Sequence, residues 1–294
     1  MSDAYRFTIL ASLLLLSSGL TSRPALAQVD LSGKWGETLT EDEPDLFPGP
    51  EIGDYTEMPI NDAARMRADT WDAQKLEMIE HECDPHGATY APFGLMFRQN
   101  LVPFTEAVAA WEVQLDYMHE KRTIYMDGRP HPPASAPHTW EGFSTGQWEG
   151  DMLRVTVTHM KEAFLRRNGL PRSEKATFIQ YFIPHGDFMT LITDVEDPVY
   201  LTEPFIRNAN FVRAPTGRLI AHYCLPSVAV EHPEGYVAYH LPGKNNFLTE
   251  YASRWGVPVE AARGGAETIY PEYQEKLARL PAPPKLPEHK ENKQ

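Results

Sequence analysis

Apolar and polar residues alternate strictly in one stretch near the middle of the chain. The apolar positions are Trp111, Val113, Leu115 and Tyr117, with one polar residue between each pair. A period of two is typical of a strand with one dry face and one wet face. The pattern resumes over 122–126, and Asp127-Gly128 then predicts a turn.

Two later hairpins share one design. Strands over 147–157 and over 178–195 each turn at a Gly-Asp pair, which begins at Gly150 in the first and at Gly186 in the second. Glycine accepts the positive φ that opens a type II′ turn, and the twist of that turn matches the flanking strands. Both segments are therefore predicted to be tight β-hairpins.

Further strands are expected near 31–38 and over 205–212. Several antiparallel strands joined by short turns predict a mainly β fold, either a closed barrel or a sandwich. Closing the sheet would remove its exposed edges. We assign residues 28–225 to this β-rich domain.

One helix is expected within this domain. The side chain of Asn61 can accept the free amide hydrogens of a first helical turn. Apolar residues between Met66 and Ile79 recur at loosely helical spacing, and the helix should end before Pro85.

The character of the chain changes after residue 225. Short helices are expected over 246–255, 259–263 and 270–280, and we interpret residues 226–280 as a helical extension packed on the barrel. Residues 281–294 are rich in Pro, Lys and Glu, which predicts a disordered tail.

Residues 1–27 have the three parts of a secretory signal peptide. Arg6 gives a basic start, an apolar run follows over 7–16, and Ala25-Leu26-Ala27 has the small-x-small pattern that signal peptidase cuts. The run is shorter than the roughly 20 residues that a membrane span needs. We therefore expect cleavage after Ala27, a periplasmic or secreted location, and no membrane span in the mature protein.

Charge narrows the choice of partners. The formal net charge is −14 at pH 7. Such an acidic surface repels phosphate backbones, which argues against nucleic acid as a partner.

The sequence has two cysteines, Cys83 and Cys224. An oxidising compartment favours a disulfide between them, and two free thiols are the alternative. His81, Cys83 and His86 also lie within six residues, but their spacing matches no common zinc pattern. We therefore expect neither a metal nor a cofactor.

Three segments carry a family resemblance. The opening Asp30-Leu31-Ser32-Gly33-Lys34-Trp35, the hairpin Trp148-Glu149-Gly150-Asp151-Met152-Leu153 and the segment Glu196-Asp197-Pro198 are similar to motifs of a family of secreted bacterial proteins without an assigned activity. The start Gly33-x-Trp35 also resembles the first strand of lipocalins. The fold that this second resemblance implies is a lipocalin-like antiparallel β-barrel with a ligand cavity.

His159 is the first candidate for chemistry. It continues the face formed by Leu153, Val155 and Val157, so it should point where those apolar side chains point. An imidazole inside a barrel could act as a general acid or base near neutral pH. The alternative is a structural histidine bonded to a backbone carbonyl.

Other candidates lie in loops and at strand ends. His138 and Trp140, followed by Glu141, could stack and polarise a ring-shaped ligand, or could anchor a loop. Arg166 and the nearby Glu174 lie in a polar stretch that could bind an anionic group or form a solvated turn.

Of two neighbouring carboxylates, one can act as a general acid while the other acts as a general base. Asp194 lies two residues before Glu196 on one strand face, though a solvated strand end is the simpler interpretation. No serine-hydrolase elbow, zinc-protease motif, P-loop or dinucleotide fingerprint occurs.

Three functions remain open at this point. In the first, the barrel binds a small apolar or aromatic molecule, and Trp111, Trp140 and Tyr181 help to line its cavity. In the second, His159 and His138 act with Glu174 or Asp194 in a hydrolase, isomerase or lyase that needs no cofactor. In the third, the protein is an envelope interaction module, whose C-terminal helices could pair two copies.

Overall fold

The computed structural model describes residues 29–38, 50–85, 94–115, 120–216, 224–226 and 231–282, and the statements below concern these residues. The expected signal peptide lies outside them, and so does the expected tail from residue 283 onward.

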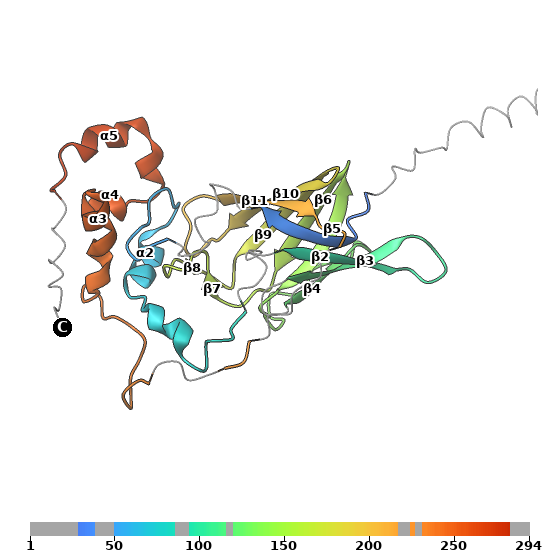
Figure 1. The fold of residues 1–294 in the computed structure, drawn as a ribbon, viewed down its shortest axis with the longest axis horizontal. Helices are drawn as coiled ribbons and strands as arrows, with labels where there is room; N and C mark the ends of the chain where they lie inside the picture. The colour runs from blue at the N-terminus through green and yellow to red at the C-terminus, as the bar shows by residue number, and fades with distance from the viewer. Residues whose placement is uncertain are drawn as a thin grey trace, which may run out of the picture. The chain divides into compact units, whose positions relative to one another are not determined.

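Nine strands of the described chain close into a barrel (Figure 1). They are β1 (Gly33–Thr38), β2 (Leu95–Leu101), β3 (Val108–Leu115), β4 (Lys121–Tyr125), β5 (Phe143–Glu149), β6 (Met152–Thr158), β9 (Thr177–His185), β10 (Phe188–Glu196) and β11 (Phe205–Arg213). The strands pair in chain order, and β11 pairs with β1 to complete the ring. The predicted β-barrel is confirmed, and the sandwich alternative is excluded.

The neighbours β4 and β5 run parallel, whereas the other barrel pairs are antiparallel. A closed ring with an odd number of strands cannot alternate direction throughout, so one pair must be parallel. Parallel strands also cannot be joined by a tight hairpin. The chain therefore crosses from one end of the barrel to the other over residues 126–142, which we call the crossing segment.

The predicted hairpin turns are confirmed. Gly150 and Gly186 have φ of 63° and 65°, and the strand pairings on either side leave a two-residue turn in each hairpin.

Alternating residues of the strands fill the interior. Leu153, Val155 and Val157 are fully buried, as their spacing predicts. Large aromatic side chains complete the core: Phe97 makes edge contacts with Trp111 and Phe182 at ring-centroid distances of 6.0 and 5.3 Å.

The helix expected after Asn61 forms, but it is shorter than its sequence pattern suggests. α2 spans Asp62–Asp69, and the side chain of Asn61 accepts a hydrogen bond from the amide of Ala64. The chain then turns and continues as a short 3-10 helix, η1 (Ala73–Glu77). A second, two-stranded sheet forms from β7 (Ala163–Phe164) and β8 (Pro171–Arg172).

The C-terminal region is helical, as expected. Its elements are η3 (Asn246–Thr249), α3 (Glu250–Trp255), α4 (Val259–Ala262), η4 (Ala266–Ile269) and α5 (Pro271–Leu277). These helices attach to the α2 region: Asn245 donates to the carbonyls of Asp69 and Trp71, and the guanidinium of Arg263 pairs with the Asp69 carboxylate. Among the described residues, no helix has the length and apolar character needed to cross a membrane.

Cys83 and Cys224 form a disulfide, which confirms their predicted pairing. The bond joins positions 141 residues apart, with 5.6 Å between their Cα atoms. It excludes Cys83 as a free thiolate ligand, and no metal-ligating cluster is found among the described residues.

Candidate functional site

Polar side chains occupy the barrel interior at one end, where β4 and β5 begin and β6 and β10 finish. Arg122, Ser144, Gln180 and Thr193 are buried there among apolar neighbours. The amide of Gln180 donates to the hydroxyl of Thr193 at 3.1 Å. Barrel cores are usually apolar, so the buried polar groups at this end need a specific explanation.

A cleft opens in the barrel wall at this end. β4 and β5 pair only at Ile124 with Ser144 and at Tyr125 with Thr145, so the residues before these positions are not held together by the sheet. The resulting cavity of about 530 Å³ lies between the two strands. We call it the seam cleft; it is lined by Pro85, Glu120, Lys121, Arg122, Thr123, Tyr125, Thr139, Trp140, Glu141, Gly142, Phe143 and Ser144.

Arg122 is the buried cation of the seam cleft. Its side chain points inward with Ile124, is only 8% exposed, and lies 5.8 Å from the ring of Phe182. Burial lowers the pKa of its guanidinium to about 10, although Glu141 and Glu120 act in the opposite direction. Arg122 is therefore charged at neutral pH, and its Nη1 makes no hydrogen bond within the described part of the chain.

Glu141 supplies the opposite charge. Both of its carboxylate oxygens are buried, and neither has a hydrogen-bond partner among the described residues. The backbone beside it is fixed by Gly142, which has φ of 69° and leaves no room for a side chain: a Cβ there would lie 2.5 Å from the carbonyl oxygen of Thr158.

Arg172 on β8 does not line the seam cleft but interacts electrostatically with Glu141. It is fully buried, packs its guanidinium 5.3 Å from the ring of Phe178, and has a pKa lowered to about 10 by burial. Asp197 raises that pKa, but its carboxylate also accepts hydrogen bonds from Ser173, Val199 and Tyr200.

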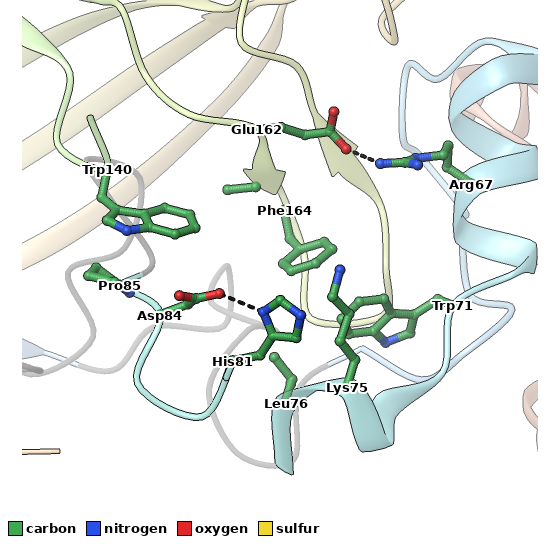
Figure 2. A pocket seen from close by; sticks show the side chains of 11 residues that line it. Arg67, Trp71, Lys75, Leu76, His81, Asp84, Pro85, Trp140, Glu162 and Phe164 are labelled. Atoms are coloured by element: carbon green, nitrogen blue, oxygen red, sulfur yellow. Dashed lines mark hydrogen bonds and ion pairs between the residues drawn. The ribbon is translucent and has the colours of Figure 1, made fainter. Parts of the chain in front are cut away.

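A second cavity, of about 250 Å³, lies beside the first. We call it the aromatic cleft; it is lined by Arg67, Trp71, Lys75, Leu76, His81, Asp84, Pro85, Trp140, Glu162, Ala163 and Phe164 (Figure 2). Trp140 and Pro85 line both clefts.

A histidine and a carboxylate meet in the aromatic cleft. Figure 2 shows the His81 ring between Asp84 and Phe164, with its Nδ1 bonded to the Asp84 carboxylate at 2.9 Å. Trp71 and Phe164 pack together at 4.4 Å between ring centroids. An imidazole is thus hydrogen-bonded to a carboxylate beside an apolar wall, an arrangement that can support acid–base catalysis.

The expected interior position of His159 is wrong. β6 ends at Thr158, and the backbone of His159 has φ of 57°, so the strand alternation stops one residue earlier than the sequence suggests. Its ring instead bonds the Thr158 hydroxyl at 2.7 Å and the Pro133 carbonyl at 3.0 Å. His159 therefore holds the crossing segment on the outside of the barrel.

His138, like His159, bonds a backbone carbonyl and so has a structural role. Its Nδ1 bonds the carbonyl of Met160 at 2.9 Å, and its ring lies 5.2 Å from that of His159. Of the expected group 138–141, the structure places Trp140 and Glu141 in the seam cleft, whereas His138 anchors the loop.

The other five residues predicted for the site lie away from both clefts. Trp111 is 1% exposed and packs in the core, while Tyr181 and Asp194 alternate with inward residues and so belong to the outer face. Glu174 is exposed, and Arg166 lies over the ring of Phe205 at 5.9 Å. None of these five lines either cleft.

Arg122 and Arg172 were not expected from the sequence. Arg122 carries a readable signal, because it occupies the same alternating face as Ile124 and is charged where an apolar residue belongs. Arg172 carries none, since its two-residue strand is too short for a pattern.

The chain was compared with family models, with curated proteins and with solved structures. None of the three comparisons gave a significant match. The geometry of the two clefts is therefore the basis for inferring a function.

Proposed function

We propose that this protein binds a small aromatic molecule in the seam cleft. The observation that carries the proposal is Arg122, a buried cation whose Nη1 has no hydrogen-bond partner in the described chain and which lines a cavity of ligand size. The proposed site lies in the barrel wall rather than on the barrel axis, where Phe97, Trp111 and Phe182 pack against one another.

The walls of the cleft suit a flat ring. Tyr125 of β4 and Phe143 of β5 stack at 5.4 Å between centroids with an interplanar angle of 28°, and the Arg129 guanidinium lies 3.8 Å from the Tyr125 ring. Trp140, just before β5, adds a further aromatic side chain to the lining. Aromatic side chains favour offset or edge contacts with a ligand ring, and a guanidinium favours an acidic substituent on that ring.

Titration calorimetry of the mature chain with benzoate and indole-3-acetate tests the proposal. We expect saturable binding that Trp140→Ala weakens about 5- to 10-fold, since a lost aromatic contact costs about 1 kcal/mol or somewhat more. Trp255→Ala is the matched control, because Trp255 is exposed and lines neither cleft. Absence of saturable binding to any aromatic acid would overturn the proposal.

Export to the periplasm or medium is part of the same proposal. The Cys83–Cys224 disulfide supports it, because such bonds persist in oxidising compartments. Expression in a bacterial host followed by N-terminal sequencing of the periplasmic fraction should give a chain beginning at Gln28. A full-length chain retained in the cytoplasm would contradict this location.

The aromatic cleft favours a second candidate, an acid–base hydrolase. The Asp84 carboxylate can orient His81, whose other nitrogen could take a proton from water that attacks an acyl carbon, while the leaving oxygen is protonated in turn. Hydrolysis of 4-nitrophenyl acetate should fall at least 10-fold in His81→Asn and stay unchanged in the exposed control His185→Asn. Equal rates in the two variants would exclude the hydrolase.

A further inference from the structure

Three polar groups without hydrogen bonds converge on the seam cleft. Within the described residues, Arg122 Nη1, both oxygens of Glu141 and the Ser144 hydroxyl are buried and have no hydrogen-bond partner. All three residues line the same cavity. Buried polar groups are normally satisfied, and the exceptions need a specific explanation.

Four charged residues line the seam cleft, namely Glu120, Lys121, Arg122 and Glu141. Of these, Arg122 and Glu141 have opposite signs and come from opposite lips. Arg122 belongs to β4, and Glu141 precedes β5 across the cleft. They influence each other electrostatically, yet no hydrogen bond joins Arg122 Nη1 to either oxygen of Glu141. A cation and an anion that face one cavity in this way can each take a separate group of a ligand.

The charges around the seam cleft oppose one another before a ligand binds, because Glu141 and Glu120 act on Arg122 and Glu141 also acts on Arg172. A ligand with a single charge would upset that balance. A ligand with only a carboxylate would pair with Arg122 but would be repelled by the carboxylate of Glu141. A ligand with only an amine would pair with Glu141 but would be repelled by the guanidinium of Arg122. Leaving an uncompensated charge buried costs more free energy than leaving a neutral group buried. A ligand that bears both charges satisfies both lips together.

We infer that the ligand of the seam cleft is zwitterionic, namely a free aromatic α-amino acid, an inference that rests on the proposed binding function. Its carboxylate would bind Arg122 and the Ser144 hydroxyl, and its ammonium group would bind Glu141. Its ring would lie against Tyr125, Phe143 or Trp140, which line the same cavity. A volume of about 530 Å³ is within the usual range for such ligands.

Three related compounds separate the contributions of the two charges. L-Phenylalanine carries both groups, 3-phenylpropanoate lacks the ammonium group, and phenethylamine lacks the carboxylate. Titration calorimetry of the mature wild-type chain should show L-phenylalanine binding at least 10-fold more tightly than either truncated compound. This ranking requires no variant, so it holds even if a substitution impairs folding.

Two charge-neutral variants assign each group to its residue. Arg122→Gln should weaken the binding of L-phenylalanine by about 10- to 100-fold, because a charge-assisted bond to the carboxylate is lost. The same variant should improve the binding of phenethylamine, because the repulsion between its ammonium group and the guanidinium is removed. Glu141→Gln should weaken L-phenylalanine similarly, but should improve the binding of 3-phenylpropanoate because repulsion is removed. Arg98→Gln and Glu149→Gln, at exposed positions outside the cleft, should change neither affinity.

The outcomes distinguish this inference from the proposed function. If 3-phenylpropanoate binds as tightly as L-phenylalanine, the inference of a zwitterionic ligand is wrong, while the proposal that the seam cleft binds aromatic molecules is supported. If none of these compounds, nor benzoate or indole-3-acetate, binds, both proposals are overturned.

Discussion

At the scale of single residues, one glycine fixes the lip of the seam cleft. Gly142 has φ of 69° and lies against the Thr158 carbonyl and the Met160 side chain. Only a residue without Cβ fits there, and its neighbour Glu141 takes its direction from that backbone.

Gly142→Ala should lower the free energy of unfolding by about 2 kcal/mol or more and weaken ligand binding in the seam cleft. Strain at positive φ and a Cβ within 2.5 Å of a carbonyl oxygen both oppose the native backbone. Gly128→Ala is a matched control, because Gly128 also has positive φ but open space around it, so only the smaller dihedral cost applies. Urea denaturation of both variants gives the difference, and equal losses would show that close packing at Gly142 has no effect.

Residue-level prediction from the sequence was accurate where alternation continued and failed where it stopped. Leu153, Val155 and Val157 face inward as expected, because their strand is regular. His159 does not, because a left-handed backbone conformation that no neighbouring residue signals ends the strand before it. The same alternation places Arg122 on the inward face with Ile124, so its position could be predicted from the sequence.

At the scale of elements, the crossing segment depends on histidines. His131 joins the hydroxyls of Thr145 and Thr158, at 2.8 and 2.7 Å, and so attaches the segment to the outer face of β5 and β6. Partial burial, together with the nearby His159, lowers the pKa of His131. Its neutral form is therefore the form that the folded state favours.

The free energy of unfolding should decrease as the pH is lowered, and His131 should account for part of that decrease. Because the pKa is lower in the folded state than the usual value of about 6.5, the stabilisation is complete above that value and is lost as the pH falls through the folded-state pKa. Urea midpoints at pH 7.5 and pH 5 should differ less in His131→Gln than in wild type. An identical pH dependence in the two proteins would refute the role of His131.

Elements with a repeating pattern or a turn signature could be predicted, and the connections between them could not. The hairpins at Gly150 and Gly186 and the cap at Asn61 follow from local chemistry. The parallel pairing of β4 with β5 depends on the total number of strands in the ring, which local patterns do not reveal.

At the scale of the whole molecule, the disulfide ties the segment after η1 to the chain beyond the last barrel strand. Cys83 lies between His81 and Asp84, whose side chains meet in the aromatic cleft. The bond thus constrains both a long loop of chain and the turn that presents this pair.

Replacing both cysteines by serine should reduce the free energy of unfolding by about 2–5 kcal/mol, because a cross-link that spans 141 residues strongly limits the unfolded chain. Thermal and urea denaturation of Cys83→Ser/Cys224→Ser measure the change. Binding in the seam cleft should persist, since neither cysteine lines it. An unaltered urea midpoint would show that the unfolded chain gains little freedom when the bond is absent.

If the seam cleft binds a ligand as proposed, the odd number of strands would let its specificity change without a change of fold. A ring of nine must hold two neighbours that run the same way, whatever side chains they carry. Substitutions at Arg122, Trp140 or Glu141 can therefore change which compound is preferred without removing the parallel pair beside which that compound would bind. Under the proposed function, the side chains that would set specificity are therefore independent of the strand pairing that keeps the cleft in place.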